Sequence, residues 1–599
     1  MRTFFLLPLF LLALSISLSA QNLSSFQLHS HNDYLQDVPF WTAFAAEASS
    51  IEVDVIAHEG QLLVAHEAAT VDPKRTIESL YLSPIAKGLE SGVISEINFH
   101  LLVDLKTEAY ATLEILLESV KGYENLFFSS SNPQGLKLII SGNRPKAEDY
   151  GKYPDWMLFD YQSKVLTEDL PWNKIGMVSL SFRQFSVWNG KGRIVESEKI
   201  GLQEFIDHVH SFQKPVRFWA SPDSKTAWKA FNEMGVDYIN TDKPIEAANY
   251  LRSLENTIYR NNEFHEIYKP DFKEDESLTP IRNIILMIGD GNGLAQISSA
   301  LFTHRNDLNL TQLRNIGLIK TQAADDFTTD SAAGATALAT GSKTNNRAIG
   351  VDSLGRHLKN LPDILDSLGF LNGIITTDQL TGATPASFYA HHSERDDTKE
   401  IAAYLSTSNI DLFVGGGEVH FESEKENLSK AGYNLTRSLD SFGGEKVGYF
   451  VAPTSLEKKQ EGRGDYLLRS TEAALSFFEK KDKPFFLMIE SAMIDSGGHS
   501  NSSSTIVSEM LDFDQVIGRL VQFADTNPGT LVLITADHET GGVSIPQGSI
   551  SSNTVELGFH SDDHTGILVP IFAYGTQSDL FRGVYENTDV FWKILELIK

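Results

Sequence analysis

Residues 283–291 read NIILMIGDG, an apolar run that stops abruptly at the acid Asp290. Three other runs in the second half of the chain also lead from apolar residues into polar ones: GIITTDQLTGATP (373–385), PFFLMIES (484–491) and TLVLITADH (530–538). Runs without alternation are typical of strands that are buried on both faces of a parallel sheet. Ligand sites in such sheets gather at the carboxyl ends of the strands. We therefore expect an α/β domain with a central, mostly parallel sheet and a polar site at one edge.

The residues that end these runs, together with those of ESAMIDSGGHS (490–500) and DDHTG (562–566), are of types that bind metal ions. They are Asp290, Thr384, Glu490, Asp495, His499, Asp537, His538 and His564. Zinc accepts histidine and carboxylate ligands, whereas magnesium prefers oxygen alone, so the set suffices for two zinc ions and a harder cation. Glu490 and Thr384 suit the oxygen-only site. Each residue taken singly is better explained as a helix cap or a surface group, but the set is a specific signal.

A candidate nucleophile lies in TTDSAAGATALATG (328–341), where Ser331 heads a run of small residues. A serine hydroxyl is a poor nucleophile until a base or a metal ion removes its proton. The stretch contains no histidine or lysine, so Ser331 is either a helix cap or a nucleophile activated by metal ligands elsewhere in the chain. Asp330 precedes it and has no assigned role.

Composition limits the partners. The formal net charge of −29 argues against nucleic acid and anionic membrane surfaces. Phosphate esters must then be bound by local cations, either basic side chains or metal ions. The chain has no cysteine, which excludes disulfides, thiol catalysis and cysteine zinc sites.

The first half of the chain contains eight short apolar runs with helical stretches between them. They are FQLHSH (26–31), IEVDV (51–55), HLLVDL (100–105), KLIISG (137–142), WMLFD (156–160), GMVSLSF (176–182), PVRFWA (215–220) and DYINTD (237–242). Eight strands in this length suggest a (β/α)8, TIM-like barrel, whose active site lies at the carboxyl ends of the strands.

Polar residues at the ends of these runs form a second candidate site. Glu52 and Asp54 share one face of a strand because side chains alternate, and with Asp104 they would make a hard site for Mg²⁺ or Ca²⁺. His31 and His66 beside such a site could act as general acid and base on a phosphodiester.

The chain is expected to comprise a signal peptide, two domains and a linker. Residues 1–20 carry Arg2, an apolar run shorter than the roughly 20 residues that span a bilayer, and small residues at the end, which predicts a secretory signal. The barrel is expected over 24–251, a polar linker over 252–280 and the second domain over 281–599, with a variable region at 396–480. The mature protein is expected to be periplasmic or secreted, without stable membrane insertion.

The second half resembles an alkaline phosphatase. The motifs that carry the resemblance, in the family's order, are MIGDGNG, TTDSAAGATALATG, TGATPASFYAHHSER, ESAMIDSGGH, TADHETGG and DDHTG. The resemblance implies a first zinc held by Asp495, His499 and His564. It implies a second zinc held by Asp290, Asp537 and His538, with Ser331 as the nucleophile.

The same resemblance implies a magnesium ion held by Asp290, Thr384 and Glu490, an Arg395 that clamps the phosphoryl oxygens, and a homodimer. Two positions depart from the family. Gly382 stands where many members place an acid or a histidine near the magnesium, and Ser496 where many have a basic or aromatic residue near the phosphate. Both bear on magnesium affinity and pH optimum rather than on the reaction type.

The first half resembles the glycerophosphodiester phosphodiesterase and phosphatidylinositol-phospholipase-like superfamily, through HND (31–33), the acid and histidine set above and GVDYINTDKP (235–244). The resemblance implies that Glu52, Asp54 and Asp104 bind the metal, that His31 and His66 are the catalytic pair, and that Lys106 contacts phosphate. HND replaces the usual HRG, so the arginine that normally touches phosphate is missing. Asp104 replaces the commoner glutamate.

The leading hypothesis is an exported phosphomonoesterase joined to a phosphodiesterase barrel, with small phosphate esters, glycerophosphodiesters or phospholipid head groups as substrates. The alternatives are a phosphatase with a non-catalytic binding barrel, a phosphodiesterase-type member of the alkaline phosphatase superfamily, and a non-enzymatic phosphate-binding protein. Thr384 and Glu490 favour a monoesterase over a diesterase in the second half.

Overall fold

The computed structural model describes residues 26–598, and the chain divides into two compact units, Met1–Glu255 and Asn256–Lys599. The expected signal peptide, residues 1–20, lies outside the described residues. Within 26–598, no helix has both the length and the apolar character needed to cross a membrane.

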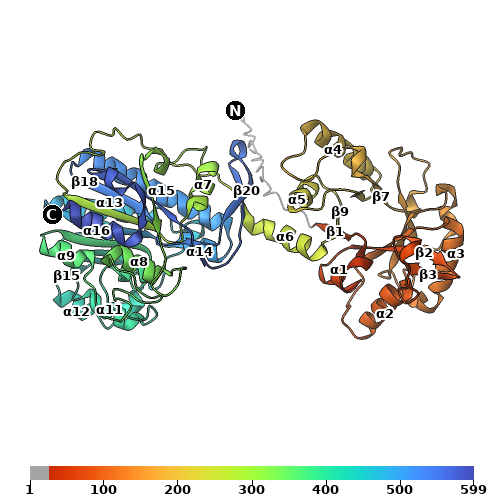
Figure 1. Ribbon diagram of the computed structural model, residues 1–599, viewed down its shortest axis with the longest axis horizontal. Coiled ribbons are helices and arrows are strands. Elements are labelled where there is room, and N and C mark those ends of the chain that lie inside the picture. The colour runs from red at the N-terminus through yellow and green to blue at the C-terminus, as the bar shows by residue number, and fades with distance from the viewer. Residues whose placement is uncertain (1–25, 599) are drawn as a thin grey trace, which may run out of the picture. The chain divides into compact units, whose positions relative to one another are not determined.

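The first unit is a closed barrel of eight parallel strands (Figure 1). The strands are β1 (Gln27–Ser30), β2 (Ser50–His58), β4 (His100–Leu105), β5 (Lys137–Gly142), β6 (Met157–Tyr161), β7 (Ile175–Ser181), β8 (Val216–Trp219) and β9 (Tyr238–Thr241). They pair in the order β1-β9-β8-β7-β6-β5-β4-β2, and β1 pairs with β2 to close the ring. All eight strands expected from the sequence are confirmed.

Helices follow most of the barrel strands. They are α1 (Trp41–Ala45), α2 (Ser83–Glu90), α3 (Ala109–Ser119), α4 (Glu196–Ser211), α5 (Lys225–Glu233) and α6 (Pro244–Thr257). The strict alternation of strand and helix is wrong after β5 and β6, where only the short 3-10 segments Ala147–Lys152 and Trp172–Lys174 follow. Pro154 ends the first segment, because the residue before a proline avoids the helical region; that residue, Tyr153, is extended with a φ of −100° and a ψ of 157°.

Outside the ring of eight, the first unit has one strand that the sequence analysis does not predict. β3 (Gln61–Val64) pairs antiparallel with β2. The connecting residues Glu59 and Gly60 both have positive φ, 47° and 78°. Two successive positive φ values match the right-handed twist of a tight hairpin.

The second unit is built on a ten-stranded sheet with the order β15-β16-β14-β13-β17-β11-β18-β23-β12-β24. Its strands are β11 (Asn283–Gly289), β12 (Asn315–Lys320), β13 (Leu371–Gln379), β14 (Leu412–Gly416), β15 (Tyr433–Leu435), β16 (Lys446–Phe450), β17 (Phe485–Ser491), β18 (Thr530–Thr535), β23 (Val569–Gly575) and β24 (Gly583–Glu586). Only the two pairings made by β23 are antiparallel. The expected mostly parallel sheet is confirmed.

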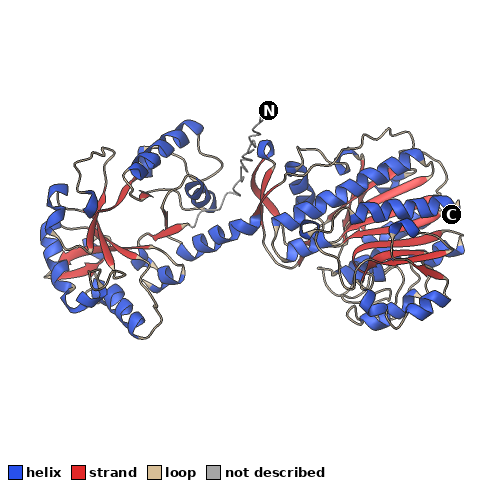
Figure 2. Ribbon diagram, turned by 180° about the vertical axis from the view of Figure 1, so that it is seen from behind, coloured by secondary structure: helices blue, strands red, loops and turns tan. Residues whose placement is uncertain are grey.

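Helices cover both faces of this sheet (Figure 2). On one face lie α7 (Leu294–Thr303), α13 (Tyr466–Lys481) and α15 (Ser503–Thr526), and on the other α8 (Ser331–Thr340), α9 (Leu361–Ser367) and α16 (Asn587–Leu597). Alternate residues of β11 enter the two cores: Ile284 and Leu286 join one, and Ile285 and Met287 the other. Burial on both faces explains why NIILMIGDG lacks alternation.

The segment expected as a linker, 252–280, has definite structure. α6 runs to Thr257, and β10 (Ile258–Arg260) pairs with β21 (Thr554–Gly558). Further along, the Tyr268 amide donates to the Asn309 side chain at 2.8 Å, and the Glu276 amide donates to the Gly575 carbonyl at 2.9 Å. The segment 396–480 supplies β14, β15 and β16 at one edge of the sheet.

Candidate active site

The carboxyl ends of four neighbouring strands carry the acids and the histidine predicted to bind metal. Asp290 follows β11, Glu490 lies in β17, and Asp537 and His538 follow β18. Thr384 lies in α10 (Ala383–Ala386), after β13. The remaining residues come from α14 (Met493–His499) and from β22 (His564–Thr565), which pairs with β19 (Glu539–Thr540).

Ser331 is the first residue of α8 and is buried, with 4% of its surface exposed. Its Oγ lies 3.2 Å from Nε2 of His538. The helix consists of small residues because it packs directly on the loop after β18, which carries Asp537 and His538. A Cβ added to Gly334 would lie 3.0 Å from the Asp537 carbonyl oxygen. The helix N-terminus, with its free amides, therefore lies beside the candidate ligands.

Asp330, which had no role from sequence, makes two kinds of contact. One carboxylate oxygen accepts a hydrogen bond from the Ala333 amide at 2.9 Å and so caps α8. The other accepts from Nη1 of Arg395 at 3.0 Å. Asp330 therefore fixes both the start of α8 and the direction of Arg395.

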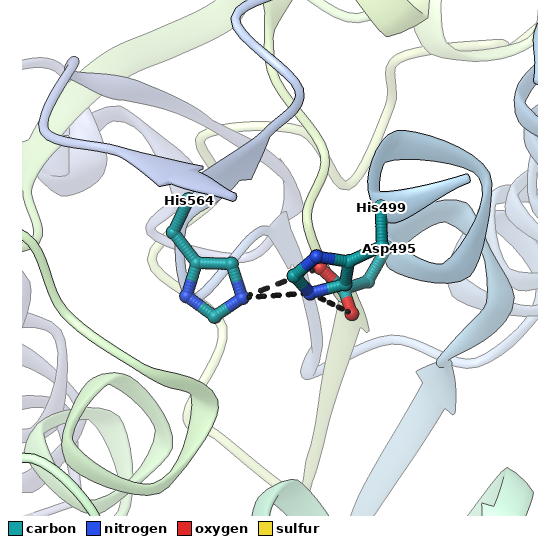
Figure 3. A group of neighbouring side chains, drawn as sticks. All are labelled: Asp495, His499 and His564. Atoms are coloured by element: carbon teal, nitrogen blue, oxygen red, sulfur yellow. Dashed lines mark hydrogen bonds and ion pairs between the residues drawn. The ribbon is translucent and has the colours of Figure 1, made fainter. Parts of the chain in front are cut away.

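Asp495, His499 and His564 converge from α14 and β22 (Figure 3). Nε2 of His499 lies 3.3 Å from the Asp495 carboxylate and 3.2 Å from Nε2 of His564. The Nδ1 atoms of the two histidines contact the backbone carbonyls of Asp562 and Thr329, at 2.6 and 2.9 Å. Both imidazoles thus turn Nε2 toward the carboxylate, the arrangement that a zinc site needs.

Asp290, Asp537 and His538 form a neighbouring group. Nε2 of His538 lies 3.3 Å from Asp290 and 3.4 Å from Asp537. Oδ1 of Asp290 and Oδ2 of Asp537 are buried and accept no hydrogen bond from the part of the chain that the structure describes. A buried carboxylate oxygen without a donor is costly unless a cation neutralises it, so these residues fit a metal ion.

Thr540 links the two groups and was not identified from the sequence. Its hydroxyl donates to Oδ1 of Asp495 and lies 3.2 Å from Nδ1 of His538. Asp495 itself comes within ligand distance of both groups, since it also clusters with Asp290 and His538.

The residues predicted for magnesium lie on the other side of Asp290. The Thr384 hydroxyl lies 3.5 Å from Oδ2 of Asp290. Glu490 accepts a hydrogen bond from Thr376, a contact not expected from the sequence. At Gly382, a Cβ would lie 3.0 Å from the Asp378 carboxylate, whose charge also acts on Glu490.

Electrostatics support a cation site. Burial, aided by the nearby charge of Asp495, raises the pKa of Asp537 to about 7. Burial and then the charge of Asp378 raise the pKa of Glu490 to about 8. Burial and then the charge of His564 lower the pKa of His538, so this imidazole is neutral and able to bind metal. Buried acids that repel one another are stabilised by cations between them.

The barrel has its own acidic cluster at the carboxyl ends of its strands. The carboxylates of Glu52, Asp54 and Asp104 lie within ligand distance of one another, because Asp54 on β2 pairs in register with Asp104 on β4. Oδ1 of Asp54 is buried and has no hydrogen bond within the described range, 26–598, which fits a bound cation. Lys106 contacts Asp54 at 2.9 Å and Asp104 at 3.1 Å.

The two predicted catalytic histidines flank this cluster. Nδ1 of His66 lies 2.8 Å from Asp54. Nδ1 of His31 lies 2.6 Å from Asp242, a partner missed from the sequence. Burial lowers the pKa of His31, but the hydrogen bond to Asp242 and the charge of Glu52 outweigh it and raise the pKa overall. The raised pKa favours the protonated form of His31.

The second unit has clear relatives. Residues 281–468 and 445–555 match the alkaline phosphatase family. Alkaline phosphatase 4 of Bacillus subtilis is 30% identical over 448 residues, which cover 59% of this chain and 96% of the relative. Alkaline phosphatase of Escherichia coli is 28% identical over 406 residues, covering 52% of this chain and 85% of the relative.

Solved structures agree. The alkaline phosphatase from the Antarctic bacterium TAB5 is 37% identical with a TM-score of 0.51, and the match covers 54% of this chain and 99% of that one. A mutant of that enzyme has been solved with magnesium bound in its M3 site. The chain therefore belongs to the alkaline phosphatase family. It is a phosphoric monoester hydrolase, of a family that uses metal cofactors.

The first unit matches phosphodiesterase families. Residues 18–100 match the AIM6-like phosphodiesterase domain, and residues 215–245 match the glycerophosphoryl diester phosphodiesterase family. The resemblance of the barrel to this group of enzymes is thereby confirmed.

Proposed function

We propose that the second unit hydrolyses small phosphate monoesters through a phosphoserine at Ser331, with two zinc ions and one magnesium ion. The observation that carries this proposal is the position of Ser331 Oγ, 3.2 Å from Nε2 of His538 at the buried start of α8. The first zinc is assigned to Asp495, His499 and His564. The second zinc is assigned to Asp290, Asp537 and His538, and the magnesium to Asp290, Thr384 and Glu490.

The side chains divide the work of phosphoryl transfer. When bound, the two zinc ions would favour the serine alkoxide and stabilise charge on both oxygens of an in-line displacement. Arg395 presents a planar fork to two phosphoryl oxygens, and Asp330 holds that fork in place. The amides at the start of α8 add donors to the same anion. Ser331 carries the phosphoryl group until water releases it.

Replacement of the nucleophile tests this proposal. Ser331→Ala should lower kcat for 4-nitrophenyl phosphate by about a thousandfold or more, because the covalent route is lost. An acid-quenched reaction should yield a phosphorylated peptide that contains Ser331 in the parent enzyme alone. Ser299→Ala, which also removes a buried serine hydroxyl but from α7, should keep full activity. Turnover by Ser331→Ala near the parent rate would refute the assignment.

We also propose that the barrel cleaves phosphodiesters of the glycerophosphodiester or phospholipid head-group type. His31 and His66 would act as the acid–base pair, while Glu52, Asp54 and Asp104 hold one Mg²⁺ or Ca²⁺. Lys106 would contact the phosphate. The support lies in the family matches and in the acidic cluster between two histidines.

A histidine variant separates the two activities. His31→Ala should abolish hydrolysis of bis(4-nitrophenyl) phosphate and leave 4-nitrophenyl phosphate hydrolysis unchanged. His58→Ala, at the exposed end of β2, should alter neither. If the parent protein cleaves no diester in a broad panel, the barrel is a binding module rather than an enzyme.

The two reactions would act in sequence, because the monoester that the barrel releases is the substrate class of the phosphatase unit. Export to the periplasm or medium, where such esters would be scavenged, belongs to the same proposal. So does a homodimer, as the alkaline phosphatase resemblance implies.

A further inference from the structure

Arg217 is a buried cation in the barrel that the proposed chemistry has not used. It is the second residue of β8, and only 3% of its surface is exposed. It nevertheless lines a cavity of about 420 Å³ whose wall includes His31, His66 and Lys106. A buried arginine at the wall of a cavity between two histidines is placed to meet an anionic ligand.

The contacts of Arg217 leave one edge of its guanidinium unused. Nη1 donates to Glu52 at 2.8 Å and to Asn240 at 3.2 Å, and it also contacts His29. Nε, on the other edge of the fork, is buried and has no hydrogen-bond partner among residues 26–598. Buried donors without partners are rare and costly, and an edge-on guanidinium is the group that best binds two phosphate oxygens.

Arg217 and Lys106 belong to different walls of the barrel. In the closed barrel, β8 and β4 are four strands apart in either direction, so they lie on opposite walls. Lys106 follows β4, where Asp54 and Asp104 hold it. Both cations line the same cavity, from opposite walls of the barrel.

We propose that Arg217 binds a non-bridging oxygen of a phosphodiester through its Nε edge, opposite Lys106. It would thereby supply the phosphate-binding arginine that this chain lacks next to His31, where Asn32 stands instead. The ligand class is a singly charged phosphodiester. The inference rests on the proposed diesterase function of the barrel.

The test measures how tightly the full-length protein binds dimethyl phosphate in the presence of Ca²⁺. Binding is detected as broadening of the ³¹P NMR line of dimethyl phosphate. All variants carry Ser331→Ala, so the phosphatase site contributes equally to each measurement. Arg217→Lys keeps the positive charge that pairs with Glu52, but a lysine ammonium lacks the second edge of N–H donors that the guanidinium has. Its affinity for dimethyl phosphate should fall roughly ten- to a hundredfold, as expected for the loss of a charged hydrogen bond.

Two further variants make the test specific. Asn240→Asp adds a negative charge 3.2 Å from Nη1 of Arg217 without removing the arginine, and it should also weaken binding. Arg252→Lys alters another arginine that pairs with a glutamate, Glu47, away from the cavity, and it should bind as the parent does. Thermal unfolding and bound calcium should be the same in all variants.

The outcomes separate the two levels of the proposal. If Arg217→Lys and Asn240→Asp bind dimethyl phosphate as tightly as the parent, Arg217 is only the counter-ion of Glu52, and the inference is overturned. If the parent itself neither binds dimethyl phosphate nor cleaves bis(4-nitrophenyl) phosphate, the diesterase function fails, and this inference fails with it.

Discussion

Gly291 packs tightly against the backbone of a candidate metal ligand, Asp495, so Gly291→Ala is an informative substitution outside the ligands. Gly291 directly follows Asp290 and has a positive φ of 71°. A Cβ there would lie 2.7 Å from Cα of Asp495 and 2.9 Å from the Thr540 hydroxyl oxygen. The closest of these neighbours is backbone, so the alanine cannot be relieved by rotating a flexible side chain.

The cost has two parts. The left-handed backbone conformation costs about 1–2 kcal/mol for a residue with a Cβ. Ordinary carbon contacts are about 3.5–4.0 Å, so the segment that carries Asp495 must also move by almost 1 Å. A displacement of about 1 Å in a positioned catalytic group can cost about a hundredfold in rate. We expect Gly291→Ala to lower kcat/KM about a hundredfold and to reduce bound zinc.

Gly355→Ala is the matched control. Gly355 lies in the same unit with a φ of 76°, and a Cβ there would meet nothing within 4 Å. Both variants therefore pay the backbone cost, and only Gly291→Ala should lose activity on 4-nitrophenyl phosphate and zinc by elemental analysis. If Gly291→Ala retains activity within threefold of Gly355→Ala, the packing argument is wrong.

Two other results are expected. Thr540→Val should weaken zinc binding by about ten- to a hundredfold, because the hydroxyl that orients Asp495 is lost. The control variant Thr526→Val, at an exposed position, should bind zinc as the parent protein does. Equal zinc content in the two variants would contradict this prediction. In the metal-free protein, the pKa values of Asp537 (about 7) and Glu490 (about 8) exceed the usual carboxyl value of about 4. The folded state therefore binds protons more tightly, and the stability these acids contribute is complete below pH ~4 and lost as pH rises through 7 to 8. In EDTA, the melting temperature should decrease as the pH is raised from 6 to 9, and added zinc and magnesium should reverse this decrease. A melting temperature that increases with pH in EDTA would contradict the placement of Asp537 and Glu490 in a cation site.

Strand positions were predictable because burial on both faces leaves a direct mark on sequence. Every apolar run named in the first half became a barrel strand, and NIILMIGDG became β11, whose alternate residues enter opposite cores. The misses lie where local turn chemistry decides the structure. The hairpin at Glu59 and Gly60 added β3, and Pro154 ends the short 3-10 segment that stands in place of a helix after β5.

Residue types and motif order predicted the candidate ligands, but not how they are held. The Asp330–Arg395 contact joins residues 65 positions apart, and the Arg217–Glu52 pair joins residues 165 positions apart. No local pattern encodes such pairs. Asp242 and Thr540 were missed for the same reason, since each is an ordinary polar residue until the fold brings it to a histidine.

The sequence by itself determined two α/β units, the strands that build them, and the family of the phosphatase half. These properties follow from hydrophobic burial and from short motifs, both of which are local. Only the tertiary structure decided which charges face one another. In the folded chain, Asp330 caps α8 and accepts a hydrogen bond from Arg395. Carboxylate oxygens that fit cations are buried, and Arg217 and Lys106 lie on opposite walls of the barrel. Electrostatic interactions act through space, so their partners are fixed by the fold and not by neighbours along the chain.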